Sequence, residues 1–200
     1  MKKIILTMAA VFAISFANAQ ETKDSSFGFA KGDIYLGGRV QYNSTKNDNG
    51  VTSVTTTSTN FSPEAGYFIS DKFAVTAGLM IGGSDNGTTK TNTFGVNLGG
   101  RYYFLNLGER FKTFTNFGLG FGSDDNGGNG AEKTSTFGIG GGLGVNYFIT
   151  SNLAIDFGLS NVLSYSTSKT GDFKSNSLDL NANVFNNFFN TATFGLIYKL

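Results

Sequence analysis

The sequence predicts an all-β chain that folds as an eight-stranded antiparallel up-and-down transmembrane β-barrel. Apolar residues alternate with a period of two in eight separate segments, which is the spacing of strands with two different faces. The connections between these segments alternate between short turns and long polar loops. An even number of such segments, with short turns on one side and long loops on the other, is typical of barrels that cross a membrane.

The N-terminus has the pattern of a secretory signal peptide over residues 1–19. Two lysines precede a short apolar run, which ends in the small-residue motif "ANA". The apolar run is short for a membrane-spanning helix, which needs about 20 residues, so the alternative of an N-terminal anchor is not favoured. We expect cleavage after Ala19, a periplasmic N-terminal segment over 20–32 and the barrel over 33–200.

The expected strands are listed here in chain order: 33–43, 57–69, 73–82, 91–104, 112–122, 135–149, 153–164 and 190–200. Tight connections are expected at "SDK" (70–72), "LNLGERF" (105–111) and "TSN" (150–152). Long loops rich in Gly, Asn, Ser and Thr are expected at 43–58, 83–91, 122–136 and about 165–189. Within the last tract, "LDLNANVFNNFFN" (178–190) fits a strand extension, a short helix or a segment over the mouth.

Each strand has one bulky face and one polar or glycine-rich face. A soluble sandwich or a lipocalin would turn the bulky face inward. Against this alternative, Tyr67, Tyr102, Tyr147 and Tyr198 all lie on the bulky face near the short-turn ends of their strands. A ring of aromatic residues at one level is expected where a barrel meets the membrane interface. The bulky face is therefore predicted to contact lipid.

The stretch "FGIGGGLGVNYFI" (137–149) shows the opposite face most clearly, because every second residue from Gly138 to Gly144 is glycine. Glycine weakens a strand, since it has no side chain to pack. In a narrow lumen it leaves space for larger neighbours, and we expect the side chains of Arg101 and Asp156 to use that space.

Four charged residues of the inward face fall at one height in the lower barrel: Arg39, Glu64, Arg101 and Asp156. An unpaired charge in a narrow lumen is costly, so we expect a network of ion pairs among them. The network either closes the lumen or forms a gate or selectivity constriction. The first interpretation is favoured, because eight strands enclose an interior that side chains can fill.

The composition argues against several other functions. The chain has no histidine and no cysteine, which removes the usual hydrolase and acyltransferase sites, so no enzyme and no cofactor are expected. Fifteen basic against 14 acidic residues, without a basic block, give no reason to bind nucleic acid. The loop "SDDNGGNGAE" (123–132) lacks the closing glutamate of an EF-hand, so no metal site is predicted, and only loosely bound calcium stays open.

Several stretches together resemble the small eight-stranded outer-membrane β-barrel family that includes outer-membrane proteins A, X and W. These stretches are "PEAGYFISDKFAV" (63–75), "RYYF" (101–104), "VNYFITSNLAIDFGLS" (145–160) and the terminal "TFGLIYKL". The resemblance implies a bacterial outer-membrane location and contact with outer-membrane lipid. It also implies a C-terminal signal for the outer-membrane assembly machinery, carried by Phe194, Leu196, Tyr198 and Leu200.

We therefore expect a non-enzymatic, monomeric integral outer-membrane protein with a structural or surface-interaction role through its extracellular loops. The sequence identifies no extracellular ligand. The alternative is a small pore or conduit for small or apolar solutes, which the many inward glycines suggest.

Overall fold

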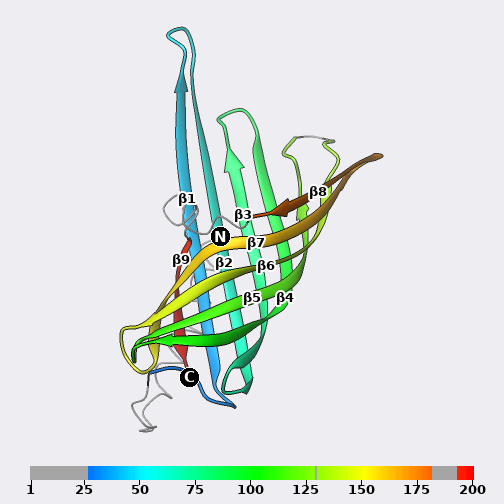
Figure 1. Ribbon diagram of the computed structural model, residues 1–200. Helices are drawn as coiled ribbons and strands as arrows, with labels where there is room; N and C mark the ends of the chain where they lie inside the picture. Colours follow the sequence, from blue (N-terminus) through cyan, green and yellow to red (C-terminus); the bar gives the residue numbers. More distant parts are fainter. Residues whose placement is uncertain (1–26, 129, 182–192) are drawn as a thin grey trace.

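The computed structural model describes residues 27–128, 130–181 and 193–200, which form nine antiparallel strands (Figure 1). The strands are β1 (Ile34–Asp48), β2 (Ser53–Ser70), β3 (Phe73–Asp85), β4 (Lys90–Leu107), β5 (Phe111–Asp124), β6 (Thr134–Phe148), β7 (Leu153–Thr170), β8 (Phe173–Leu180) and β9 (Thr193–Lys199). No helix in these residues is long and apolar enough to cross a membrane. The expected signal peptide and most of the tract 178–190 lie outside the described residues.

The strands close into a barrel with eight positions, which confirms the predicted fold. Each strand from β1 to β7 pairs with the next, and β9 pairs with both β7 and β1. β8 and β9 share the eighth position. β8 pairs with β7 over Leu163–Thr170, whereas β9 pairs with β7 over Leu153–Gly158.

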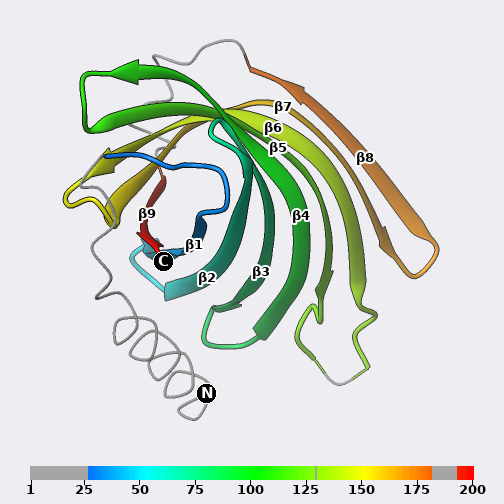
Figure 2. The same ribbon diagram turned by 90° about the horizontal axis from the view of Figure 1, so that it is seen from below.

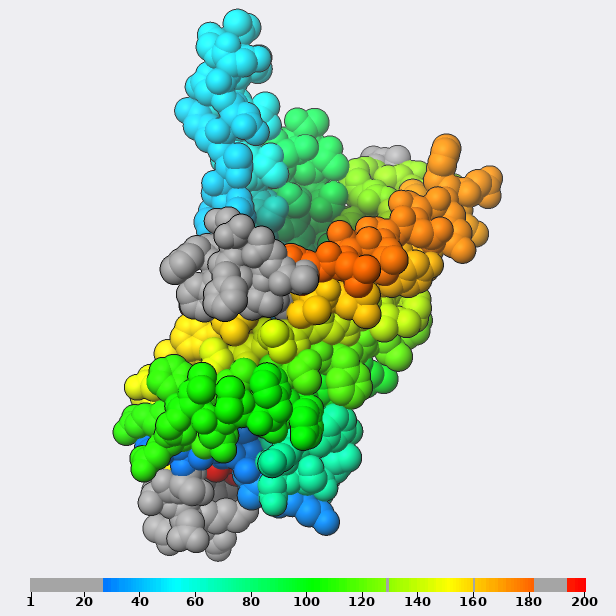
Figure 3. Space-filling model, viewed as in Figure 1, coloured from blue at the N-terminus to red at the C-terminus, as the bar shows by residue number. Residues whose placement is uncertain are grey.

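Two of the predicted long loops are wrong over most of their described length. The tract 43–58 is a β-ribbon, because β1 and β2 stay paired up to Asp48 and Ser53. The tract after 165 continues β7 and forms a hairpin with β8 through a turn at Gly171. Threonine and valine favour extended backbone. The polar residues among them therefore indicate strands that are exposed to water, and they do not indicate a loop. Both hairpins project from the barrel (Figure 3, cyan and orange).

The other connections lie where they were predicted, with shifted bounds. The loops at 83–91 and 122–136 shorten to 86–89 and 125–133, because the flanking strands extend into them. The tight connections are 71–72, 108–110 and 149–152. The barrel therefore has a turn end with these short connections and a hairpin end, which carries the extended β1–β2 and β7–β8 hairpins and the loop at 125–133.

At the turn end, large side chains fill the lumen. Tyr35, Phe68, Phe114, Phe148 and Ile197 are at most 2% exposed. We call this group, together with Phe29, the aromatic floor. The rings of Phe29 and Phe68 are stacked with centroids 4.4 Å apart.

Residues 27–33, which precede β1, run across the opening at the turn end, as seen from below in Figure 2. The Gly32 N–H donates to the Phe68 carbonyl oxygen at 2.8 Å. The Lys199 Nζ donates to the Gly28 carbonyl oxygen at 2.7 Å. These bonds hold Phe29 in the floor, so this part of the predicted periplasmic segment also fills the barrel.

Replacing Phe29 with alanine should lower the free energy of unfolding by about 2–4 kcal/mol, because the ring leaves a cavity among the other aromatic residues. The measurement is the urea midpoint of the barrel in lipid vesicles, followed by gel mobility without heating. Phe173, which is 85% exposed, provides the control substitution Phe173→Ala. Equal midpoints for the two variants would show that Phe29 contributes nothing to the floor.

Candidate functional site: the charged layer of the lumen

The carboxylate of Asp156 lies at the centre of a buried polar cluster above the aromatic floor. Asp156 is 3% exposed. Its Oδ1 accepts hydrogen bonds from Arg101 Nη1 and from Asn146 Nδ2, both at 2.8 Å. Its Oδ2 accepts a hydrogen bond from Arg39 Nη2. One carboxylate from β7 is thus bound by side chains from β1, β4 and β6.

Arg101 extends this cluster to β2. Its Nη2 lies 2.7 Å from Glu64 Oε1, which also accepts a hydrogen bond from the Tyr35 hydroxyl at 2.7 Å. The guanidinium carbon lies 4.5 Å from the centre of the Phe114 ring, which is a favourable cation–π distance. Arg101 is therefore held by two carboxylates and by the floor beneath it.

The four charges that the sequence placed at one height lie together in the structure. Arg39, Glu64, Arg101 and Asp156 carry two charges of each sign and form three ion pairs. We call them the charged layer. Arg101 and Asp156 are buried, whereas the side chains of Arg39 and Glu64 are 32% and 25% exposed.

Three polar members of the cluster did not appear in the sequence prediction. The Tyr103 hydroxyl donates to Asn146 Oδ1 at 2.7 Å, and Tyr35 binds Glu64 as described above. Strand parity could have found the tyrosines. Tyr35 is four residues from Arg39 and Tyr103 is two residues from Arg101, so each shares the inward face of its strand.

The glycine face of β6 is used differently from the prediction. A Cβ at Gly144 would lie 2.3 Å from the ring of Phe114, so this ring occupies the space that was expected to hold Arg101 and Asp156. A Cβ at Gly138 would meet nothing closer than 3.7 Å. The glycines near the turn end accommodate the floor, whereas Gly138 lines open space.

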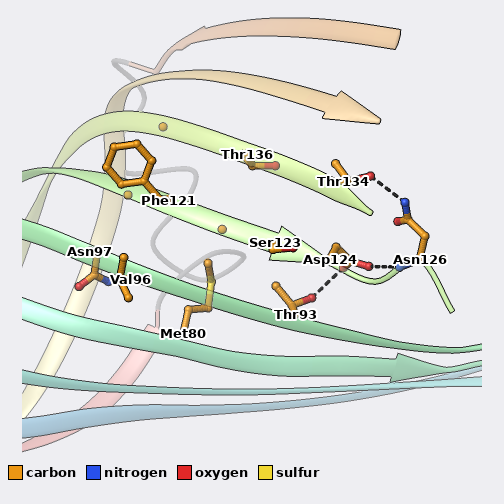
Figure 4. Close-up of a pocket in the computed structure, with 13 residues that line it drawn as sticks. Met80, Thr93, Val96, Asn97, Phe121, Ser123, Asp124, Asn126, Thr134 and Thr136 are labelled. Carbon is orange, nitrogen blue, oxygen red and sulfur yellow. Dashed lines mark hydrogen bonds between the residues drawn. The ribbon is translucent and has the colours of Figure 1, made fainter. Parts of the chain in front are cut away.

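That open space is a cavity of about 450 Å³ toward the hairpin end (Figure 4). It is lined by Met80, Thr93, Asn97, Gly120, Gly138 and neighbouring residues of β3 to β6. Thr93 donates to Asp124 at 2.7 Å, and Asn126 donates to Thr134 at 2.8 Å. Much of the polar rim is thus already hydrogen-bonded within the protein.

In the acidic loop at 123–132, the carboxylates of Asp124 and Asp125 also accept hydrogen bonds from within the protein. Hydrogen bonds from the side chain and the backbone N–H of Asn92 hold the pKa of the Asp125 carboxyl below its usual value. Asp124 accepts bonds from Thr93 and from the Asn126 N–H. Within the described residues, no group of three or more acidic side chains is arranged to hold a metal ion.

The remaining predicted residues lie on the outer surface. Tyr67 and Tyr102 are 47% and 43% exposed near the turn end, and Tyr147 and Tyr198 are half-buried there. Phe194, Leu196 and Leu200 of the C-terminal segment are also exposed. Their proposed roles, as an interfacial girdle and as an assembly signal, stay predictions.

Replacing Asp156 with asparagine should lower the free energy of unfolding by about 3–5 kcal/mol, because two arginines then share the single carboxylate of Glu64. The urea midpoint in lipid vesicles measures the loss. Asp179→Asn removes an exposed carboxylate of β8 and is the control, for which we expect a change below about 0.5 kcal/mol. A midpoint for Asp156→Asn equal to that of the control would contradict a stabilising layer.

Gly144→Ala should lower the free energy of unfolding by about 1–3 kcal/mol, because the new methyl group collides with Phe114. Gly138→Ala makes the same chemical change on the same strand where space is free, so it should be neutral or slightly stabilising. The difference between the two urea midpoints tests this account. If both substitutions lowered the urea midpoint equally, the loss would come from replacing glycine in the strand and not from a collision with the aromatic floor.

Comparisons with known proteins agree with this geometry. A family model described as an outer membrane protein beta-barrel domain matches residues 5–187. No curated protein matches the chain.

Two solved structures illustrate the similarity. The outer membrane protein OprG from Pseudomonas aeruginosa has 14% sequence identity and a TM-score of 0.51, over 86% of this chain and 98% of OprG. Neisserial surface protein A (NspA) has 18% identity and a TM-score of 0.51, over 84% of this chain and 97% of NspA. At these identities the structural likeness shows the fold, and the family match covers most of the chain. The protein therefore belongs to the outer-membrane β-barrel family and is located in the outer membrane of a Gram-negative bacterium.

Proposed function

We propose that the protein is a closed, non-enzymatic barrel that holds exposed β-ribbons at the cell surface for structural or surface-interaction purposes. The observation that carries this proposal is the two-tier filling of the lumen, with the charged layer directly above the aromatic floor. An extended pore would require both tiers to open.

The charged layer is costly to open. Arg101 and Asp156 are 4% and 3% exposed and form an ion pair with each other. Moving one of them aside would break this buried pair and leave the other with a single opposite charge, Glu64 for Arg101 or Arg39 for Asp156, at a cost of several kcal/mol. This supports a structural role for the layer over a gate that opens readily.

The ribbons supply the surface for a binding role. The β1–β2 ribbon beyond residue 42 is exposed on nearly all of its residues and stands clear of the barrel (Figure 3). Its residues are mainly Thr, Ser and Asn, whose hydroxyl and amide groups offer hydrogen bonds without a strong charge. These side chains suit a partner that binds the ribbon through polar contacts.

The residues of the lumen do not suit catalysis. The chain has neither histidine nor cysteine, and the inward carboxylates Glu64 and Asp156 are engaged by arginine. Because arginine occupies their oxygens, these carboxylates are unsuited to act as a general acid on a substrate.

The cavity of about 450 Å³ favours the alternative, a conduit for small or apolar solutes. Met80 and the glycines of β5 and β6 give it a partly apolar lining. A solute that entered there would still face the charged layer and the floor before reaching the turn end. The cavity therefore supports solute entry more than solute passage.

Conductance of the purified protein in a planar bilayer distinguishes these functions. We expect no steady unitary current from the wild-type protein. Steady currents whose ion selectivity changes in Arg39→Ala, but not in the ribbon variant Lys46→Ala, would overturn the closed barrel and support the conduit.

A further inference from the structure

Near the hairpin end, four lysines lie on the outward faces of the strands, and two of them are neutralised within the protein. Lys46 lies 3.6 Å from Asp48, and Lys90 lies 2.9 Å from Asp85. The hydrogen bond from Lys90 is the main cause of a lowered pKa of the Asp85 carboxyl. These two lysines therefore have local counter-ions.

The other two lysines, Lys169 and Lys174, lie directly opposite each other on β7 and β8. Both are exposed, and neither has an ion-pair partner within the described part of the chain. The acids of this region, Asp172 in the turn and Glu132 against Gly171, form no ion pair with them. Like charges directly opposite each other destabilise a β-ladder, so the hairpin carries an uncompensated cost in the isolated protein.

The same face of the hairpin continues toward the membrane as an apolar strip. Tyr165 pairs with Leu178 and Leu163 pairs with Leu180, and all four side chains are at least 40% exposed. Each lysine lies four residues beyond this strip, which is about 13 Å along an extended strand. Lysine can bend its apolar stem over such a surface and keep its charge at the level of lipid headgroups.

A further donor completes the arrangement. Ser135 on β6 pairs with Lys169 in the ladder and is exposed. Ser135, Lys169 and Lys174 therefore form one row across three strands. Opposite Cβ atoms are about 4.5–5.5 Å apart, so both ammonium groups can reach one compact dianion.

We propose that Ser135, Lys169 and Lys174 bind the phosphate group of a phosphorylated glycolipid in the outer leaflet, whose acyl chains lie over the apolar strip. The outer location follows from the position of the row at the hairpin end, since the longer connections of such barrels face the outside. A phosphate supplies the counter-charge that the protein lacks there and accepts hydrogen bonds from all three side chains. The site does not depend on whether the lumen conducts.

Native mass spectrometry of the full-length barrel, released from vesicles of phosphatidylcholine with phosphorylated lipid A, tests the site. The double variant Lys169→Gln with Lys174→Gln should retain the lipid about 30-fold more weakly, since each lysine contributes on the order of fivefold to anionic lipid binding. The matched control, Lys46→Gln with Lys90→Gln, should bind as the wild type does. Dephosphorylated lipid A should be retained equally weakly by all three proteins.

Lys169→Glu separates lipid binding from folding. It places opposite charges across the β7–β8 ladder, which should raise the urea midpoint in detergent while lowering lipid retention. Wild-type retention by Lys169→Glu or by the double glutamine variant would overturn the proposal. So would equal retention of lipid A with and without its phosphates, or displacement of the lipid by millimolar inorganic phosphate as effectively as by lipid A.

Discussion

The rest of the interior depends on the buried carboxylate of Asp156. A charge at 3% exposure is tolerated only when it is paired, and here donors from β1, β4 and β6 converge on it. Because β1, β4 and β7 are far apart in the sequence, the network joins separate parts of the ring across the lumen. Glu64 balances the second arginine, so the layer is neutral as a whole. The closed lumen that we propose rests on this requirement for charge compensation.

Packing of the floor depends on glycines placed opposite large rings. A Cβ at Gly66 would lie 2.1 Å from the ring of Tyr35, and one at Gly144 would lie 2.3 Å from Phe114. The rings can fill an eight-stranded lumen only because the facing wall has no side chains at these points. The same residue type farther along β6 leaves the cavity open. Glycine therefore has two uses in this barrel, and the neighbouring side chains decide between them.

The period of two and the turn spacing predicted the eight-position ring, and the heights of four charges predicted which side chains would lie together. Other features could not be read in this way. The β1–β2 ribbon has a polar composition that resembles a loop, because both of its faces contact water. Phe29 lies outside the alternating segments, so no periodicity shows that it enters the barrel. Parity places Tyr103 on the inward face, but its hydrogen bond to Asn146 depends on the register of β4, β5 and β6.

The central claim is that the charged layer and the aromatic floor exclude water from the turn end of the lumen. The chain has no cysteine, so a single introduced cysteine can be labelled without background. Ser166 faces the upper lumen and Ala154, which is 0% exposed, lies on the same face of β7 below Asp156. The most direct measurement compares labelling of Ser166→Cys and Ala154→Cys by a membrane-impermeant thiol reagent added outside oriented vesicles. The account predicts rapid labelling at 166 and almost none at 154, whereas equal rates at both positions would contradict it.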